Sequence, residues 1–349
     1  MELYYVGLDI HKRTISYCRK KSDGRIIDEG RIGSSRSCID ALIGRLGEHW
    51  IGGMESTMFS GWVYDHFYRR GHKLRVAHPY EMSWISKSKK KNDRIDAAKI
   101  ADLLRCGLLP EVVMLTPEQR EMRKIMRFRT MMLQLAVKMK NCTSTLLMEN
   151  GIEYDDRRLH GKRYFESLAD EIEGEVPDSV SALLGLSRSA VEYFDAGQKR
   201  LIRELANHPS LKDRLALLMT IPGVGIITAL TWALEVGDPH RFSRTRHAVS
   251  YCGLCSAQKE SAEKSNRGPL SKQRNSRLQT VLIEAAKLAP RFSPALREVH
   301  DRELTKGNRN RATVAVARKL VSYLLYVDKN HKEFEPILNS NSSPVLASQ

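Results

Sequence analysis

Residues 3–10 read "LYYVGLDI", a short run of aromatic, β-branched and aliphatic residues that favours a β-strand. The next segments, "TISYCRK" (14–20) and "RIIDEGRIG" (25–33), predict two further strands, each only a few residues after the one before. Three strands joined by hairpin-length connections argue against a sheet in which every strand is followed by a helix.

Beyond residue 33 the sequence predicts helices that alternate with strands. The segment "SCIDALIGRLGE" (37–48) has apolar residues at helical spacing. The expected elements are, in order, a helix at 37–48, a strand at 50–56, a helix at 61–71, a strand at 73–79 and a helix at about 93–106. The order β-β-β-α-β-α-β-α is that of an α/β RNase H-like domain, which we expect to occupy residues 1–114.

A long helix is predicted to follow this domain. "TPEQ" (116–119) marks its start, with Thr116 as the N-cap and Pro117 in the first helical position. Apolar residues then recur at alternating spacings of three and four, as Ile125, Phe128, Met132, Leu135, Met139, Cys142 and Leu146. Such a seam is typical either of one helix in a bundle or of a dimerising coiled coil. A helix at about 178–206 could pack back on it, so residues 115–208 are predicted to form a helical coiled-coil assembly segment.

The last third is predicted to be a mainly α-helical domain at residues 209–330. Residues 211–238 form two apolar helical stretches on either side of "PGVG", an arrangement that indicates a helix-hairpin-helix. Further helices are expected at 245–252, 275–289 and 311–328. The polar, low-complexity segment at 331–349 is expected to be disordered.

Composition points to nucleic acid as the partner. The chain has 57 Lys and Arg residues against 41 Asp and Glu residues, a net charge of +16 over 349 residues. Its basic segments are spread along the chain, which favours an extended polyanion. Because no run of about 18 apolar residues and no signal-type block is found, we expect no membrane partner and a cytoplasmic, nucleoid-associated protein. Six scattered cysteines fit a reduced compartment, and the lone "CGLC" (252–255) favours structural thiols over zinc or redox chemistry.

Four acidic residues are expected to meet at one edge of the predicted sheet. Asp9 stands among apolar neighbours in a strand, where a buried carboxylate is costly unless it is paired or bound to a cation. Glu55 ends the fourth strand, which lies beside the first in an RNase H-like sheet, and Asp93 and Asp96 share one face at a helix start. An acidic pair at a helix start also complements the helix dipole, and Glu55 could cap a loop. The joint pattern nevertheless favours a metal site.

Oxygen-rich clusters of this kind suit Mg²⁺ or Mn²⁺. Two such ions roughly 4 Å apart activate an attacking oxygen and stabilise a leaving oxygen at a phosphodiester. The adjacent lysines, among them Lys89, Lys90 and Lys91, would then offset the charge of a nucleic-acid backbone beside the site.

Two further segments are candidates for contact with a phosphate backbone. In "IPGVG", Gly223 and Gly225 permit close approach of backbone N–H groups to a phosphate, although a tight corner between helices also requires glycine. The basic segment "NRGPLSKQRNSR" (266–277) contributes Arg267, Lys272 and Arg274.

Two sets of motifs occur in the chain, one in each half. The first comprises "GLDIHK", "MEST" and "KNDRIDAAKIADLL"; the second comprises "IPGVGIITAL", "GDPHRF", "YCGL", "RGPLSKQRNSRLQTVLIEAAKLAP" and "GNRNRATVAVARKL". Together they closely resemble the DEDD transposases of insertion elements, the IS-one-ten family, over about residues 3 to 330.

The resemblance implies roles for particular residues. Asp9, Glu55, Asp93 and Asp96 match the four family acids of a RuvC-like divalent-metal site. A serine of the C-terminal domain, here Ser261, matches the nucleophile that becomes linked to DNA phosphate. Ser256 stands where the family usually has proline and Ala262 where it has glycine, so Ser256 and Ser265 remain alternatives to Ser261.

The resemblance also implies a function and partners. The protein is expected to be a transposase that cleaves and rejoins double-stranded DNA, guided by a structured bridge RNA encoded by its element. The family picture is a homo-oligomer, from dimer to tetramer, with sites shared between chains. Two alternatives remain open: a RuvC-like structure-specific nuclease that acts by metal-activated water, and a non-catalytic RNA- or DNA-binding protein.

Overall fold

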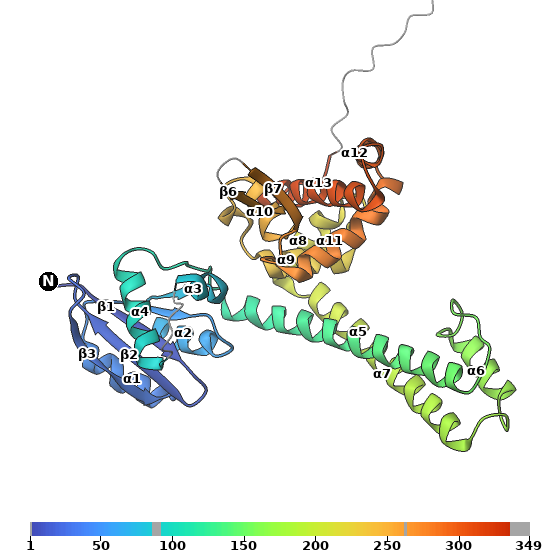
Figure 1. Ribbon diagram of the computed structural model, residues 1–349, viewed down its shortest axis with the longest axis horizontal. Helices are drawn as coiled ribbons and strands as arrows, with labels where there is room; N and C mark the ends of the chain where they lie inside the picture. Colours follow the sequence, from blue (N-terminus) through green and yellow to red (C-terminus); the bar gives the residue numbers. More distant parts are fainter. Residues whose placement is uncertain (1, 86–91, 262–263, 336–349) are drawn as a thin grey trace, which may run out of the picture. The chain divides into compact units, whose positions relative to one another are not determined.

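The computed structural model of the chain describes residues 2–85, 92–261 and 264–335 (Figure 1). The chain divides into two compact units, residues 1–117 and 118–349, and each unit has its own hydrophobic cores. Among the described residues, no helix has the length and apolar character needed to cross a membrane.

The first unit is built on a five-stranded mixed sheet. Its strands are β1 (Tyr4–Ile10), β2 (Thr14–Lys20), β3 (Ile26–Gly33), β4 (Trp50–Glu55) and β5 (Leu74–Ala77). They lie in the order β3-β2-β1-β4-β5, with β1 antiparallel to β2 and parallel to β4. This mixed sheet with its helices is consistent with the expected α/β RNase H-like domain. The central position of β1 therefore puts the strand that carries Asp9 next to the strand that ends in Glu55.

Helices cover both faces of this sheet. They are α1 (Arg36–Leu46), α2 (Ser60–Arg69), α3 (Pro79–Ile85) and α4 (Asp93–Arg105), of which α3 is not predicted from the sequence. Val6, Leu8 and Ile10 of β1 share a core with buried residues of α1 and α2. Since successive strand residues point to opposite faces, Gly7 and Asp9 belong to the other face, where α4 lies.

The contact between β1 and α4 depends on a missing side chain. A β-carbon added at Gly7 would lie only 2.0 Å from the Ala97 carbonyl oxygen and 2.5 Å from the Ala101 nitrogen. The backbone of α4 therefore rests directly on β1 at Gly7. One helical turn before Ala97 is Asp93, and two residues after Gly7 is Asp9, so this contact brings the two acids toward each other.

The second unit begins with a long helical hairpin, which we call the arm (Figure 1). It consists of α5 (Pro117–Glu149) and α7 (Asp178–Ala206), with the short helix α6 (Lys162–Glu171) between them. The two long helices run side by side: a β-carbon at Gly197 would lie 2.2 Å from Cε of Met132. Helix α5 contributes to two separate cores, with Met122 and Met126 in the C-terminal core and Leu147 in a core shared with α6 and α7.

The heptad seam predicted for α5 does not coincide with its buried face. The buried residues are Met122, Met126, Met132, Ala136, Thr143 and Leu147. Phe128 and Cys142 of the predicted seam are exposed, and Met132 alone of its seven members is buried. The reason is that the buried positions include small residues such as Ala136 and Thr143, whereas a search for large apolar side chains selects an adjacent stripe.

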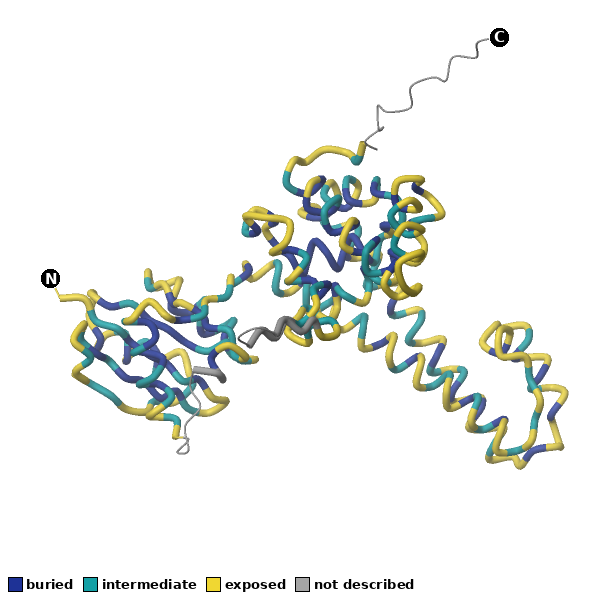
Figure 2. Tube along the Cα trace, turned by 45° about the horizontal axis from the view of Figure 1, so that its top comes forward, coloured by how far each residue is buried: buried dark blue, intermediate teal, exposed yellow. Residues whose placement is uncertain are grey.

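The rest of the second unit is a compact group of helices and one hairpin. The helices are α8 (Pro209–Met219), α9 (Ile226–Val236), α10 (Thr245–Tyr251), α11 (Ser276–Leu288), α12 (Pro294–Leu304) and α13 (Arg309–Asn330), with 3-10 turns η1 (Pro239–Arg241) and η2 (Ala289–Arg291). Strands β6 (Ser256–Ser261) and β7 (Lys264–Leu270) form an antiparallel hairpin. Figure 2 shows buried positions along the inner sides of these helices. Helix α12 and the hairpin are not predicted from the sequence.

A buried carboxylate joins the arm to this helical group. Glu235, at the end of α9, has a side chain only 4% exposed and accepts two hydrogen bonds of 3.1 Å from Arg127 of α5. Asn275, the N-cap of α11, donates a third at 3.0 Å. Arg123 of α5 donates to the carbonyl oxygens of Leu234 and Glu235. One acid therefore holds three helices together.

Candidate metal centre and nucleic-acid interface

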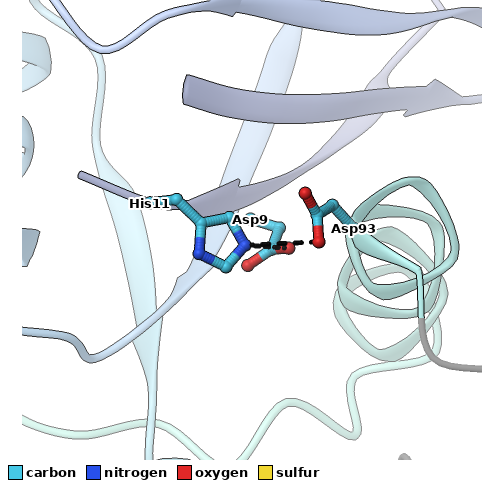
Figure 3. A group of neighbouring side chains, drawn as sticks. All are labelled: Asp9, His11 and Asp93. Atoms are coloured by element: carbon cyan, nitrogen blue, oxygen red, sulfur yellow. Dashed lines mark hydrogen bonds and ion pairs between the residues drawn. The ribbon is translucent and has the colours of Figure 1, made fainter. Parts of the chain in front are cut away.

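Asp9, His11 and Asp93 form a cluster at one edge of the sheet (Figure 3). Asp9 lies near the end of β1, His11 follows the strand, and Asp93 is the first residue of α4. Nε2 of His11 is 3.0 Å from Oδ2 of Asp9 and 3.5 Å from Oδ1 of Asp93. One ligand atom from each residue lies within 4.8 Å of the others. The expectation that Asp9 and Asp93 lie close together therefore agrees with the geometry.

The environment of Asp9 explains why its carboxylate needs a partner. Burial raises the pKa of Asp9, and the charges of Asp93 and Asp96 act in the same direction, while the charge and hydrogen bond of His11 act against it. The Asp9 side chain is 13% exposed, compared with 51% for His11. A divalent cation would relieve the repulsion among these carboxylates. The residues present fit such an ion, because they supply hard oxygen ligands around one point.

The other two predicted acids lie beside the cluster but outside it. Asp96 lies in the first turn of α4, with one carboxylate oxygen 3.6 Å from Nζ of Lys99. The β1–β4 register pairs Leu8 with Met54, so Asp9 and Glu55 are the next residues on neighbouring strands. Glu55 does not belong to the group of mutually close ligand atoms.

Two residues that sequence reasoning did not assign to the site take part in it. His11 follows Asp9 by two residues, and the strand period that puts both on one face was the signal that could have identified it. Arg31 of β3 donates a 2.8 Å hydrogen bond to Oδ2 of Asp93. No sequence signal distinguishes Arg31 from other strand arginines, because its approach depends on how β3 pairs with β2.

The candidate nucleophile belongs to the hairpin of the second unit. Ser261 ends β6 and its backbone pairs with Lys264, Ser265 pairs with Glu260, and Ser256 begins the strand opposite Leu270. The three candidate serines are thus spread along one hairpin, and their backbone positions do not choose among them.

The predicted phosphate-contacting residues have different surroundings. Gly223 has φ of +84°, and a β-carbon there would lie 2.6 Å from Cβ of Ala289, so this glycine has a packing role. Gly225 is the N-cap of α9 and has open space around it. Helices α8 and α9 lie on either side of this glycine turn, and the helix-hairpin-helix with its grip on DNA stays a prediction.

The basic residues fall into three groups. Lys272 and Arg274 are exposed in the connection between β7 and α11, where Arg274 donates to the Ser271 carbonyl oxygen. Arg267 lies in β7, its backbone paired with Gln258. Lys89, Lys90 and Lys91 lie outside the described residues.

The "CGLC" cysteines have the character of structural thiols. Cys252 is buried, and burial raises the pKa of its thiol to about 12. Cys255 is half-buried, and all six cysteines are free. In the part of the chain that the structure describes, the one group of metal-ligand type is Asp9, His11 and Asp93.

Comparison with known proteins gives two family matches that follow one another along the chain. Residues 6–150 match the DEDD transposase family of IS110, described as "Transposase". Residues 215–301 match the "Transposase IS116/IS110/IS902 family". The first match contains all four predicted acids, and the second contains the hairpin with Ser261.

Curated relatives agree with these matches over most of the chain. A putative transposase, y4qE, of Sinorhizobium fredii is 27% identical over 81% of this chain and 70% of its own length. The transposase for insertion sequence element IS1328 of Yersinia enterocolitica is 28% identical over 76% and 80%. The transposase for element IS1111A of Coxiella burnetii is 26% identical over 91% and 87%.

These similarities define the class of the protein, which is that of the DNA transposases, enzymes that act on DNA. Within that class, the chain belongs to the IS110 family of insertion-sequence transposases.

Proposed function

We propose that the chain moves its insertion sequence by metal-dependent cleavage and rejoining of DNA strands, with Ser261 as a covalent nucleophile. The observation that carries the metal half is the cluster of Asp9, His11 and Asp93, whose ligand atoms lie around one point at the sheet edge. The four acids Asp9, Glu55, Asp93 and Asp96 would hold Mg²⁺ or Mn²⁺. When bound, the ion would supply Lewis-acid stabilisation of charge at the phosphodiester.

The serine half rests on the family and on the position of Ser261 within the second family match. The Ser261 hydroxyl loses its proton and its Oγ forms a bond to phosphorus, while the bond from phosphorus to the neighbouring deoxyribose oxygen breaks. That oxygen leaves as a hydroxyl, so overall it gains the one proton that the serine loses. Rejoining is the reverse reaction with the hydroxyl of a different strand.

Basic and glycine residues are assigned to hold the phosphate backbone of the nucleic acid. Lys89, Lys90 and Lys91 would act beside the acids, and Gly225 with Arg267, Lys272 and Arg274 would act in the second unit. Gly223 would contribute by shaping the turn. A structured RNA encoded by the element would supply sequence recognition through base pairing. The net charge of +16 supports binding of such an RNA, because it gives the protein a general affinity for polyanions.

Assembly into a homo-oligomer is assigned to the arm. Phe128 and Met131 of α5 are 52% and 43% exposed, and Leu186 and Tyr193 of α7 are 67% and 71% exposed. Phe128 and Met131 share one face of α5, and Leu186 and Tyr193 share one face of α7, because residues three or seven apart lie on the same side of a helix. Adjoining apolar side chains this exposed are characteristic of a surface that another protein covers. Joining two DNA ends requires at least two protomers, so the partner that we assign to this surface is the arm of a second copy.

The test combines purified protein, the RNA transcribed from the flank of its element, Mg²⁺ or Mn²⁺, and end-labelled donor DNA. After denaturation, protein–DNA adducts are separated from free DNA. Wild type is compared with Ser261→Ala and Asp93→Asn, and Ser256→Ala and Ser265→Ala serve as matched controls on the same hairpin. We expect an adduct in wild type and in both controls, and its loss in Ser261→Ala and Asp93→Asn.

Other results would redirect the proposal. Free cut ends without an adduct, unchanged in Ser261→Ala, would make the protein a nuclease that uses water. Loss of the adduct in Ser256→Ala or Ser265→Ala alone would move the nucleophile to that serine. Cleavage that does not depend on added RNA would remove the guide from the scheme.

A further inference from the structure

The cluster at the sheet edge contains a nitrogen ligand in addition to carboxylates. Nε2 of His11 is 3.0 Å from Oδ2 of Asp9 and 3.5 Å from Oδ1 of Asp93. In Figure 3 the imidazole nitrogen and one oxygen of each acid point toward a common centre. Three side chains from two elements thus present one ligand atom each.

The two distances from His11 are near the spacing of neighbouring ligands around one ion. With metal–ligand distances of about 2.1 Å, adjacent corners of an octahedron are about 3 Å apart. The two distances from His11 are close to that value, and the oxygens of Asp9 and Asp93 lie within 4.8 Å of each other. Asp9, His11 and Asp93 could therefore each offer one atom to a single ion after side-chain adjustments.

The other oxygen of Asp93 has a separate partner. Arg31 donates a 2.8 Å hydrogen bond to Oδ2, so Oδ1 is the oxygen that faces His11. The His11 side chain is half-exposed, so its ring is accessible to an incoming ion. A plain His11–Asp9 hydrogen bond is the alternative explanation of the same contact, and it would leave the nitrogen outside the metal shell.

We propose that His11 is a direct ligand of the divalent ion, and that the nitrogen makes this site prefer Mn²⁺ to Mg²⁺. The inference rests on the proposed metal site and adds to it one ligand and a choice of ion. Mg²⁺ takes oxygen ligands almost exclusively, whereas imidazole binds first-row transition metals. A shell of one imidazole and several carboxylates therefore selects the softer ion.

The test measures the metal itself. Mn²⁺ is bound to the full-length protein, and electron spin echo modulation reports whether a ¹⁴N nucleus is coordinated. Calorimetry gives the affinities for Mn²⁺ and for Mg²⁺. The variants are His11→Gln, the exposed-histidine control His49→Gln, and Asp93→Asn.

We expect nitrogen modulation in wild type and His49→Gln and none in His11→Gln. Mn²⁺ binding should weaken in His11→Gln by about tenfold or more, since loss of a residue that only supports a ligand already costs that much. Mg²⁺ binding should weaken by a smaller factor in His11→Gln. Asp93→Asn should lose the binding of both Mn²⁺ and Mg²⁺.

Two outcomes distinguish a failure of the His11 proposal from a failure of the proposed metal site. Mn²⁺ bound without nitrogen modulation in wild type, and with equal affinity in His11→Gln, would overturn the role of His11 while leaving the carboxylate site intact. Unchanged Mn²⁺ binding in Asp93→Asn would instead refute the metal site on which both proposals depend. Because the wild-type spectrum is itself diagnostic, the result does not depend on the folding of any variant.

Discussion

Glu235 is a buried acid whose charge is balanced by the arm. Burial raises the pKa of this carboxyl, but hydrogen bonds and charges from Arg127, Arg123 and Asn275 outweigh burial and hold the pKa below its ordinary value of 4.5. A depressed pKa in the folded chain means that the ionised side chain stabilises the fold above about pH 4.5. That contribution is lost as the pH falls through the lowered pKa.

We therefore expect Glu235→Gln to lower the free energy of unfolding at pH 7 by about 1.5–3 kcal/mol, the range for hydrogen bonds to a charged group. The difference from wild type should shrink as the pH is lowered below 4.5, where wild type loses the same charge. Chemical denaturation at a series of pH values measures this. Glu298→Gln, at an exposed carboxylate of α12, is the control and should differ little from wild type at any pH. If the free energy of unfolding differed between wild type and Glu235→Gln by the same amount down to pH 3, the charge of Glu235 would not be what stabilises the fold.

At the level of single residues, sequence reasoning identified some of the site. Asp9 stood out because a carboxylate among apolar strand neighbours requires a partner, and the structure gives it His11 and Asp93. His11 could have been placed by strand alternation, but histidine at a strand end has many ordinary explanations. Ser261 had no physical signal of its own and was chosen by resemblance, because a loop serine looks the same whether or not it reacts.

The contact between β1 and α4 has a testable requirement for glycine. Gly7→Ala would put a methyl group 2.0 Å from the Ala97 carbonyl oxygen, so α4 must move away from the sheet. We expect a loss of about 1–3 kcal/mol of stability, typical of overpacking, with weaker Mn²⁺ binding because Asp93 moves with α4. Thermal unfolding and calorimetry of Mn²⁺ measure the two effects.

Gly44→Ala is the matched control for this substitution. Gly44 lies inside α1, and a β-carbon there meets nothing within 4 Å. It should raise stability by about 0.5–1 kcal/mol, because alanine is the better helix former. If Gly7→Ala behaved like Gly44→Ala, the close approach of α4 would not be what positions Asp93.

At the level of elements, long periodic segments predict where helices and strands lie, although the heptad seam of α5 does not predict its buried face. The strands of the first sheet and the helices α5 and α7 agree with expectation to within a residue or two. The short helix α3 and helix α12 were missed. The β6–β7 hairpin is not predicted from the sequence, since its charged residues mask the alternation that marks a strand.

At the level of the whole molecule, the exposed stripe of the arm predicts an assembly. The double substitution Phe128→Glu and Met131→Glu adds charge to two exposed positions of α5 and should convert the oligomer to monomer. Light scattering after size-exclusion chromatography measures the mass. Asn141→Asp, exposed further along the same helix, adds charge away from these two positions and should leave the mass unchanged. Equal masses for all three proteins would place the interface elsewhere.

Large-scale organisation was predictable only in part. The order of an α/β unit, a long helical segment and a mainly helical region follows from changes in hydrophobic period along the chain. How the arm packs on the C-terminal helices of its own unit depends on contacts such as Arg127 to Glu235, residues far apart in sequence that no local pattern connects. The division of residues 115–208 from 209–330 stays a prediction, whereas the structure separates residues 1–117 from 118–349.

Helix α5 is continuous in its backbone but takes part in two cores. Its first turns carry Met122 and Met126 into the core of the C-terminal helices, and its last turns carry Leu147 into the core with α6. Local opening depends on the buried contacts that hold each region. We therefore expect the amide protons at the two ends of this one helix to exchange with deuterium at different rates, each following the core that its end enters. Equal rates along the whole helix would show that the two cores open together.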